Sequence, residues 1–204
     1  YMNNINKTDI LQLYQFGPVL AKYKLEDNFV EELYLRGNKT HKDYSSQLAG
    51  HIKKENQFDL KDRQWFLNNT NEIFLKYLEV LKLRSLKKKN VSKIELTSLW
   101  INFMKNGEFN PIHDHSGDIS FVIYVAVPDE LIKEKHEFKG KGVGPGTISF
   151  LYGEESNSYT SHYNFFPQKG LMFIFPAKLR HFVTPFQSKV IRISISGNLR
   201  FIYN

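Results

Sequence analysis

The sequence of 204 residues contains no cysteine. This absence excludes disulfide bonds, thiolate metal sites and cysteine nucleophiles, so any metal ion must be held by histidine, aspartate or glutamate side chains. No window approaches the roughly 18 apolar residues that a membrane-spanning helix requires. The first residues also lack the basic and apolar regions of a secretory signal. We therefore expect a cytoplasmic protein with no membrane partner.

The net charge of +7 raises the question of a nucleic-acid partner. The 28 lysine and arginine residues are spread along the chain, however, and the one dense run is Lys87–Lys89. We interpret this run as a solvated loop. The scattered charges argue against a nucleic-acid partner and favour a small-molecule or peptide substrate. The sequence gives no indication of the oligomeric state.

The pattern of apolar residues changes near residue 90. Before this point apolar side chains recur at helical spacing, which predicts a short helix from Phe29 to Gly37 and an amphipathic helix over residues 70–86. The alternating segment Pro18–Lys24 predicts a strand. The N-terminal part is therefore expected to be largely helical.

After residue 90 the sequence is typical of β structure. Segments rich in β-branched and aromatic residues are separated by turn signals such as Asn106-Gly107 and Gly197-Asn198. The predicted strands are Glu95–Met104, Ile119–Val127, Gly146–Leu151, Leu171–Phe175 and Val190–Ser196. Many short strands with regular turns favour a sandwich, barrel or jelly roll. We expect a single domain over residues 1–204, with an N-terminal flank at 1–90 and a β core at 91–204.

Two of the seven histidines, His113 and His115, are separated by one residue. If this segment is extended, their side chains share one face, with Cα atoms ~6.6 Å apart. Two imidazoles at that spacing can converge on one metal ion, and His181, after the predicted strand Leu171–Phe175, is the candidate third ligand. Surface or capping roles are the alternative for the pair. The histidines for which we expect no metal role are His41, His51, His136 and His162.

The segment Val190–Ser196 alternates almost without interruption. One face carries isoleucines, and the other carries Arg192 with Ser194 and Ser196. An arginine that faces an apolar core without a partner is destabilising. It suits a pocket that receives an anion, because a guanidinium binds a carboxylate through two parallel hydrogen bonds. An arginine on the exterior of a barrel is the alternative interpretation.

The order and spacing of these residues resemble the 2-oxoglutarate/Fe(II)-dependent dioxygenases, specifically the prolyl-4-hydroxylase-like branch and its small bacterial and phage members. The segment Leu48–Ile52 also resembles the N-terminal flank of that group, so the resemblance covers about residues 45–200. It is specific as an ordered set and weak in any single part. The residues that carry it are Trp100 and Asn102, His113 and His115, Tyr124-Val125 and Pro128, Phe175-Pro176, His181, and Arg192, Ser194, Ser196 and Asn198.

The resemblance implies a mainly β protein with flanking helices, built as a double-stranded β-helix, or jelly roll. It also implies an enzyme that uses Fe(II), 2-oxoglutarate and O2 to hydroxylate a C–H bond, of prolyl type or in another peptide or small molecule. The implied site residues are His113, His115 and His181 for the metal, Arg192 with Tyr124 or Ser194 for 2-oxoglutarate, and Trp100 and Asn102 for the substrate pocket.

This expected site departs from the usual triad of two histidines and one carboxylate. Most branches of the family have aspartate at the position of His115. Three assignments are open: His115 completes a three-histidine site, Asp114 turns inward through a bulge, or Asp118 reaches across the loop. Strand parity favours His115, because a regular strand points Asp114 to the opposite face.

Two other functions are alternatives. A cupin-like metal- or ligand-binding module without 2-oxoglutarate turnover could use the same fold, but it would not need Arg192 and its serine face. A nucleic-acid demethylase would carry a lysine-rich stripe beside the pocket, which the scattered lysines do not indicate. The segment 129–170 contains no pattern that identifies the primary substrate.

Overall fold

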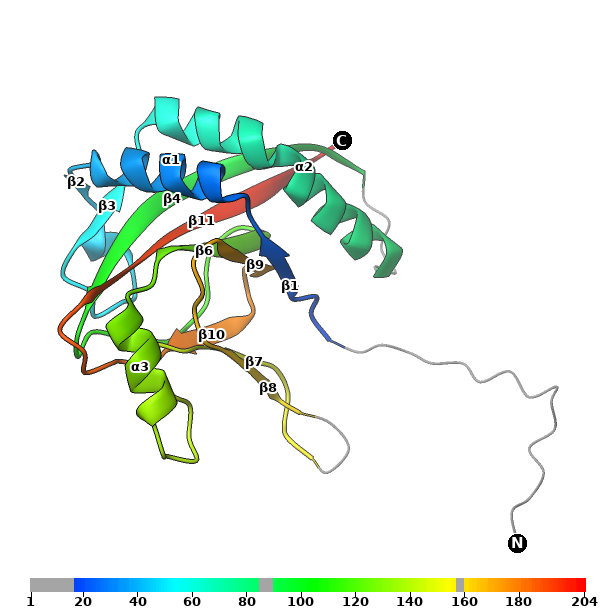
Figure 1. Ribbon diagram of the computed structural model, residues 1–204. Helices are drawn as coiled ribbons and strands as arrows, with labels where there is room; N and C mark the ends of the chain where they lie inside the picture. The colour runs from blue at the N-terminus through cyan, green and yellow to red at the C-terminus, as the bar shows by residue number, and fades with distance from the viewer. Residues whose placement is uncertain (1–16, 85–89, 157–159) are drawn as a thin grey trace, which may run out of the picture.

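The computed structural model describes residues 17–84, 90–156 and 160–204. In this part of the chain, two antiparallel sheets face each other, and two helices cover the outer face of the larger sheet (Figure 1). None of the described helices is long and apolar enough to cross a membrane. The elements are β1 (Ala21–Lys24), α1 (Asp27–Asn38), β2 (Lys42–Asp43), the 3₁₀ turn η1 (Ser45–Gln47), β3 (Glu55–Gln57), α2 (Leu60–Arg84), β4 (Val91–Lys105), β5 (Asn110–His113), β6 (Ile119–Ala126), α3 (Asp129–Glu137), β7 (Ile148–Leu151), β8 (His162–Phe165), β9 (Leu171–Pro176), β10 (Arg180–Val183) and β11 (Ile191–Tyr203).

The larger sheet has the strand order β1-β9-β6-β11-β4-β3-β2, and the smaller sheet has the order β5-β10-β7-β8. Strands β4 and β11 form the central pair of the larger sheet. Their pairing runs from Ile191 opposite Lys105 to Tyr203 opposite Val91. The first 90 residues contribute β1, β2 and β3 to this sheet in addition to α1 and α2. Two facing antiparallel sheets with crossed connections form a jelly roll, which confirms the predicted fold class.

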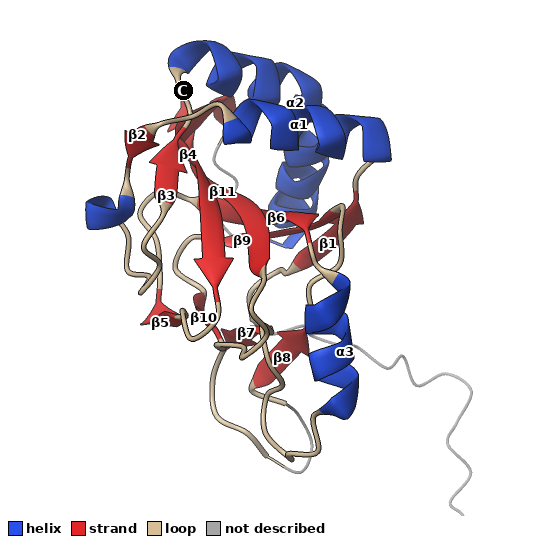
Figure 2. Cartoon of the chain, turned by 60° about the vertical axis from the view of Figure 1, so that its left-hand side comes forward, coloured by secondary structure: helices blue, strands red, loops and turns tan. Residues whose placement is uncertain are grey.

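Two hydrophobic clusters divide the interior into layers. One lies between the helices and the larger sheet and includes Leu33, Phe66 and Ile195. The other lies between the two sheets and includes Phe150 and Phe173. Figure 2 shows α1 and α2 on the face of the larger sheet that points away from β5, β10, β7 and β8. The space between the two sheets therefore remains for a site.

Helix α2 begins at Leu60 rather than at residue 70 as predicted. Asp59 explains the early start, because its side-chain Oδ1 accepts a hydrogen bond from the N–H of Asp62 (2.8 Å) and its carbonyl oxygen accepts one from Arg63 (3.0 Å). A short acidic residue in this position satisfies the free N–H groups of a first turn. The predicted end at residue 86 and the predicted Lys87–Lys89 loop lie outside the described residues.

Two glycines that were predicted to end a helix or a strand instead allow close packing inside these elements. The prediction of a turn at Gly197-Asn198 is wrong, because both residues lie inside β11. A Cβ atom on Gly197 would lie 2.6 Å from the Ser98 carbonyl oxygen and 2.6 Å from the Phe121 ring, so glycine permits the close approach of the neighbouring strands. Helix α1 passes Gly37 and ends at Asn38, and a Cβ on Gly37 would lie 2.6 Å from the Ile101 side chain.

Candidate metal centre and adjoining cavity

Three histidines from two strands and a loop converge between the sheets. His181 on β10 is the direct cross-strand partner of His113 on β5. His115 follows β5, and its backbone N–H donates to the Ala177 carbonyl oxygen over 2.8 Å. The potential ligand atoms of the three imidazoles all lie within 4.8 Å of one another. The structure thus brings together the three histidines that the sequence analysis selected.

Two of these imidazoles are held in one tautomer by the backbone. The Nδ1 atom of His113 lies 2.7 Å from the Pro111 carbonyl oxygen, and Nδ1 of His181 lies 2.9 Å from that of Leu179. Because a carbonyl oxygen can only accept, each Nδ1 carries the proton and donates it. Nε2 of each ring is left with a free lone pair, which is the arrangement that supports metal-binding histidines.

Burial keeps the three imidazoles neutral. It lowers the pKa of His181 to about 3 and that of His115 to about 4, and the neighbouring His113 adds to both shifts. Burial also lowers the pKa of His113. All three rings can therefore offer a lone pair at neutral pH without first losing a proton.

The donor set fits a small divalent metal ion. Imidazole nitrogens bind such ions at ~2.1 Å, so two neighbouring ligands at a right angle stand ~3 Å apart. The Nε2 atoms of His115 and His181 are separated by 3.2 Å. Small movements of the His113 ring would complete one face of a coordination sphere and leave other positions open for ligands.

The two competing carboxylates have other partners. Asp114 lies at the surface, where its Oδ1 accepts a hydrogen bond from Lys178 (2.9 Å), which lowers the pKa of this carboxyl. Oδ2 of Asp118 accepts a hydrogen bond from the backbone N–H of Phe201 (2.7 Å). In the described chain no carboxylate belongs to the histidine cluster. This geometry favours His115 over Asp114 and Asp118 as the third donor.

A cavity of about 370 Å³ adjoins the three histidines between the sheets. Four side chains that line it form a row across the larger sheet, because they are cross-strand partners: Glu55 on β3, Asn102 on β4, Ser194 on β11 and Tyr124 on β6. Within the row, Nδ2 of Asn102 lies 3.3 Å from Ser194 Oγ. Oδ1 of Asn102 accepts a hydrogen bond from Nε1 of Trp100 over 3.0 Å, which ties Trp100, two residues earlier on β4, to the row. The predicted pocket residues thus share one wall.

Arg192 lies beside this row, two residues before Ser194 on β11, and is buried without a counter-ion. Only 2% of its surface is exposed, and no acidic side chain of the described residues forms an ion pair with it. Its Nη1 donates to the Gly146 carbonyl oxygen over 3.0 Å, and its guanidinium lies 5.4 Å from the centre of the Tyr124 ring. Nε of Arg192 and the Tyr124 hydroxyl have no hydrogen-bond partner in the described part of the chain. A buried cation with unused donors is suited to an anionic ligand.

Glu55 lies at the end of the row opposite Tyr124, and the sequence analysis did not select it as a site residue. Its side chain is 2% exposed, and its Oε2 finds no hydrogen-bond partner among the described residues. Burial, together with the negative charges of Glu108 and Asp43, raises the pKa of Glu55 to about 8. The sequence around it, Lys53-Lys54-Glu55-Asn56-Gln57, is that of a solvated segment. Only the pairing of β3 with β4 turns this glutamate toward the cavity.

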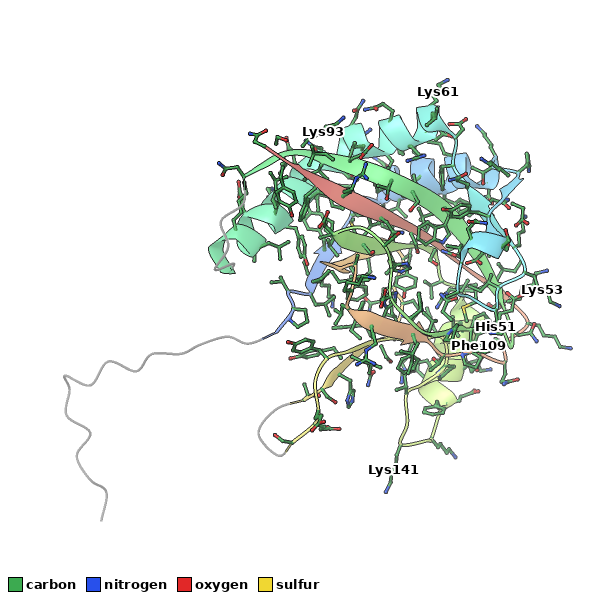
Figure 3. The ribbon with its side chains drawn as sticks, turned by 180° about the vertical axis from the view of Figure 1, so that it is seen from behind. His51, Lys53, Lys61, Lys93, Phe109 and Lys141 are labelled. Carbon is green, nitrogen blue, oxygen red and sulfur yellow. The ribbon has the colours of Figure 1, made fainter. Side chains whose placement is uncertain are left out.

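The four remaining histidines lie outside the cluster. His51 is exposed, and its ring stacks on that of Phe109 with centroids 4.6 Å apart. The two labelled residues lie next to each other in Figure 3. His136 is exposed on α3, and His41 is exposed before β2. His162 on β8 lies 4.0 Å from a carboxylate oxygen of Glu155.

Comparison with known proteins agrees with this geometry. Residues 98–198 match a family model described as "Putative 2OG-Fe(II) oxygenase". Two solved structures share the fold. A prolyl-4-hydroxylase from Pseudomonas putida is 13% identical, with a TM-score of 0.57 over 89% of this chain and 91% of the other. The viral collagen prolyl hydroxylase of Paramecium bursaria Chlorella virus-1, solved with 2-oxoglutarate, is 13% identical, with a TM-score of 0.56 over 90% and 96%.

No curated protein matches this chain. The matched segment begins within β4 and ends within β11, so it contains all three histidines, Arg192 and part of each long central strand. Its family uses Fe(II), 2-oxoglutarate and O2. From the family match, the fold and the site together, the chain belongs to the 2OG-Fe(II) oxygenase family.

Proposed function

We propose that this chain hydroxylates a C–H bond of a peptide or small-molecule substrate, with His113, His115 and His181 holding Fe(II) and Arg192 binding 2-oxoglutarate. In the overall reaction, substrate R–H, 2-oxoglutarate and O2 give R–OH, succinate and CO2. The observation that carries the proposal is the buried, unpaired guanidinium of Arg192 in the same cavity as three neutral imidazoles. A binding module without turnover would have no use for that cation.

Different parts of the cavity would bind 2-oxoglutarate and the metal ion. Arg192 and the Tyr124 hydroxyl, both lacking partners in the described residues, would hold the distal carboxylate of 2-oxoglutarate at one end of the row. The backbone carbonyls of Pro111 and Leu179 would keep two imidazoles aimed at the metal. Bound Fe(II) supplies the O2 chemistry that couples decarboxylation of 2-oxoglutarate to hydroxylation of the substrate.

A prolyl-type substrate is the specific case that we propose to test first. Support comes from the likeness in fold to two prolyl hydroxylases. The cavity wall also offers aromatic surface for an apolar ring, since the rings of Tyr44 and Trp100 lie 6.0 Å apart and Trp100 lies 6.0 Å from His115. The substrate ring would then lie close to the proposed metal position.

Succinate production tests the proposal. Protein supplied with Fe(II), ascorbate, 2-oxoglutarate and O2 should form succinate, and prolyl peptides should increase the rate if they are substrates. An 18O2 atmosphere should place one labelled oxygen in succinate and one in the hydroxylated product. Metal binding without any consumption of 2-oxoglutarate, with or without peptides, would instead favour the cupin-like binding module.

A further inference from the structure

We propose that the cavity selects substrates that carry a cationic nitrogen, an ammonium or guanidinium group, and that the Glu55 carboxylate binds this nitrogen. The inference rests on the proposed function, because it assigns the substrate class for the same cavity. It makes Glu55 a specificity-determining residue, in contact with substrate rather than with 2-oxoglutarate.

The placement of Glu55 follows from strand register. Glu55 pairs with Asn102, Asn102 pairs with Ser194, and Ser194 pairs with Tyr124. Side chains of such cross-strand partners point to the same face of a sheet. Three strand spacings of about 4.8 Å place Glu55 roughly 14 Å along the sheet from Tyr124. A ligand held by Tyr124 and Arg192 would thus leave the Glu55 end of the cavity free for a second molecule.

The Glu55 carboxyl lacks the partners that its acidic neighbours have. Glu108 accepts hydrogen bonds from the backbone N–H groups of Lys105 (2.8 Å) and Lys53 (3.2 Å). Asp43 accepts two hydrogen bonds from Ser45. Oε2 of Glu55 is buried with no such partner within the described residues. A buried acceptor left unpaired is destabilising, and a bound donor would remove that penalty.

The charges around Glu55 favour a cationic donor over a neutral one. Of the described side chains that line the cavity, Arg192 is the only lysine or arginine. Its guanidinium lies 5.4 Å from the ring centre of Tyr124, which is at the end of the row opposite Glu55. The negative charges of Glu108 and Asp43 make the near end electronegative, and their repulsion of an ionised Glu55 contributes to the raised pKa of this carboxyl. A protein with a net charge of +7 therefore holds a locally acidic subsite. A substrate ammonium would displace the proton from Glu55 and form a charge-assisted hydrogen bond.

Matched pairs of probes test this inference without turnover. Mn(II)-loaded protein with 2-oxoglutarate, kept free of O2, would be titrated by calorimetry with three pairs that differ in charge. The pairs are blocked lysine against blocked norleucine, blocked arginine against blocked citrulline, and prolinamide against N-acetylprolinamide. We expect the cationic member of at least one pair to bind more than about tenfold more tightly, because only that member can form a charge-assisted hydrogen bond with the Glu55 carboxylate.

Two variants separate the Glu55 contact from general electrostatics. Glu55→Gln should reduce the affinity ratio of that pair to about one. Glu95→Gln, which removes a carboxylate paired with Arg200 at the surface, should keep the ratio of the parent. The inference is overturned if no cationic member is preferred, or if the preference survives in Glu55→Gln.

Proton release gives a second measurement that needs no variant. With the pKa of Glu55 at about 8, its carboxyl is mostly protonated at pH 7. Binding of the preferred cationic probe should therefore release close to one proton, detected as a dependence of the heat on the buffer, and a cation that binds with no release contradicts the inference. Titration of the same samples with 2-oxoglutarate keeps the two proposals apart. If 2-oxoglutarate binds and no cation is preferred, only this inference fails, whereas no 2-oxoglutarate binding means that the proposed function fails.

Discussion

His113 and His181 face each other as direct partners on β5 and β10, and each donates its Nδ1 proton to the carbonyl oxygen two residues earlier in the chain. The same local device therefore orients two rings from segments that are far apart in the sequence. Both Nε2 atoms have a free lone pair before any metal arrives. Such pre-orientation reduces the reorganisation that metal binding requires.

Removal of either imidazole should abolish tight metal binding. We expect His113→Ala and His181→Ala to weaken Fe(II) affinity by more than the roughly 10- to 100-fold that changes to outer-shell partners cause. Metal content after equilibrium dialysis, measured by plasma mass spectrometry, checks this. His136→Ala on the exposed face of α3 is the matched control and should retain the affinity of the parent. Parent-like affinity in His181→Ala would exclude this residue as a ligand.

The third ligand can be decided by comparing two adjacent changes. His115→Ala should lose bound Fe(II), because His115 Nε2 lies 3.2 Å from that of His181. Asp114→Asn should retain it, because the Asp114 carboxylate pairs with Lys178 at the surface. The same dialysis measurement applies. Iron lost in Asp114→Asn and kept in His115→Ala would reverse the assignment.

Arg192→Gln should raise the concentration of 2-oxoglutarate required for half-maximal succinate production. Loss of a buried charge-paired contact weakens binding by about 2–5 kcal/mol, which corresponds to a factor of about 30 or more. The reason is that Arg192 is buried and has no described acidic partner that competes for its donors. Fe(II) affinity should change much less, since the guanidinium is not part of the histidine cluster.

Arg180→Gln provides the control for this prediction. Arg180 lies on β10 next to His181, but its side chain is exposed. Its replacement should leave the 2-oxoglutarate requirement near that of the parent. If both arginine variants shifted the requirement equally, the effect would come from overall charge rather than from the cavity.

Glu55→Gln should become more stable than the parent as the pH rises. The pKa of Glu55 is about 8 in the folded protein and close to 4.3 in an unfolded chain. Between these values the folded state holds a proton that the unfolded state has lost, so the stability of the parent falls with rising pH. The free energy of unfolding of the parent should fall by up to roughly 1.4 kcal/mol per pH unit for this proton, and that of the variant should not.

Urea unfolding at pH 5, 6, 7 and 8 measures this difference. The stability gap between Glu55→Gln and the parent should widen from each pH of the series to the next. Glu95→Gln should show no such trend, because that carboxylate lies at the surface and its ion pair with Arg200 lowers its pKa. A constant gap across the series would mean that Glu55 is ionised throughout.

Local patterns in the sequence predicted the parts of the site that depend on strand parity. Alternation in Val190–Ser196 placed Arg192 and Ser194 on the face opposite the isoleucines, and the structure agrees. One-residue spacing likewise placed His113 and His115 together. The inference for Arg192 and Ser194 succeeds because a strand has a fixed period of two residues, whereas His115 lies two residues past the end of β5.

The parts that the sequence did not reveal depend on long-range pairing. Glu55 reaches the cavity only because β3 adds to the edge of β4, and its polar neighbours give no sign of burial. Gly197 was interpreted as a turn residue because glycine occurs both in turns and where strands approach closely. Only the positions of Phe121 and Ser98 in the folded chain show that close approach is its role here. The early start of α2 at Leu60 is different, since the capping residue Asp59 was present in the sequence.

A crystal structure of the Mn(II)-loaded protein soaked with 2-oxoglutarate without O2 tests the central claim most directly. It should show one ion bound by Nε2 of His113, His115 and His181 at about 2.1–2.2 Å. The distal carboxylate of 2-oxoglutarate should accept two hydrogen bonds from Arg192. An ion bound elsewhere, or a 2-oxo acid that makes no contact with Arg192, would contradict the account.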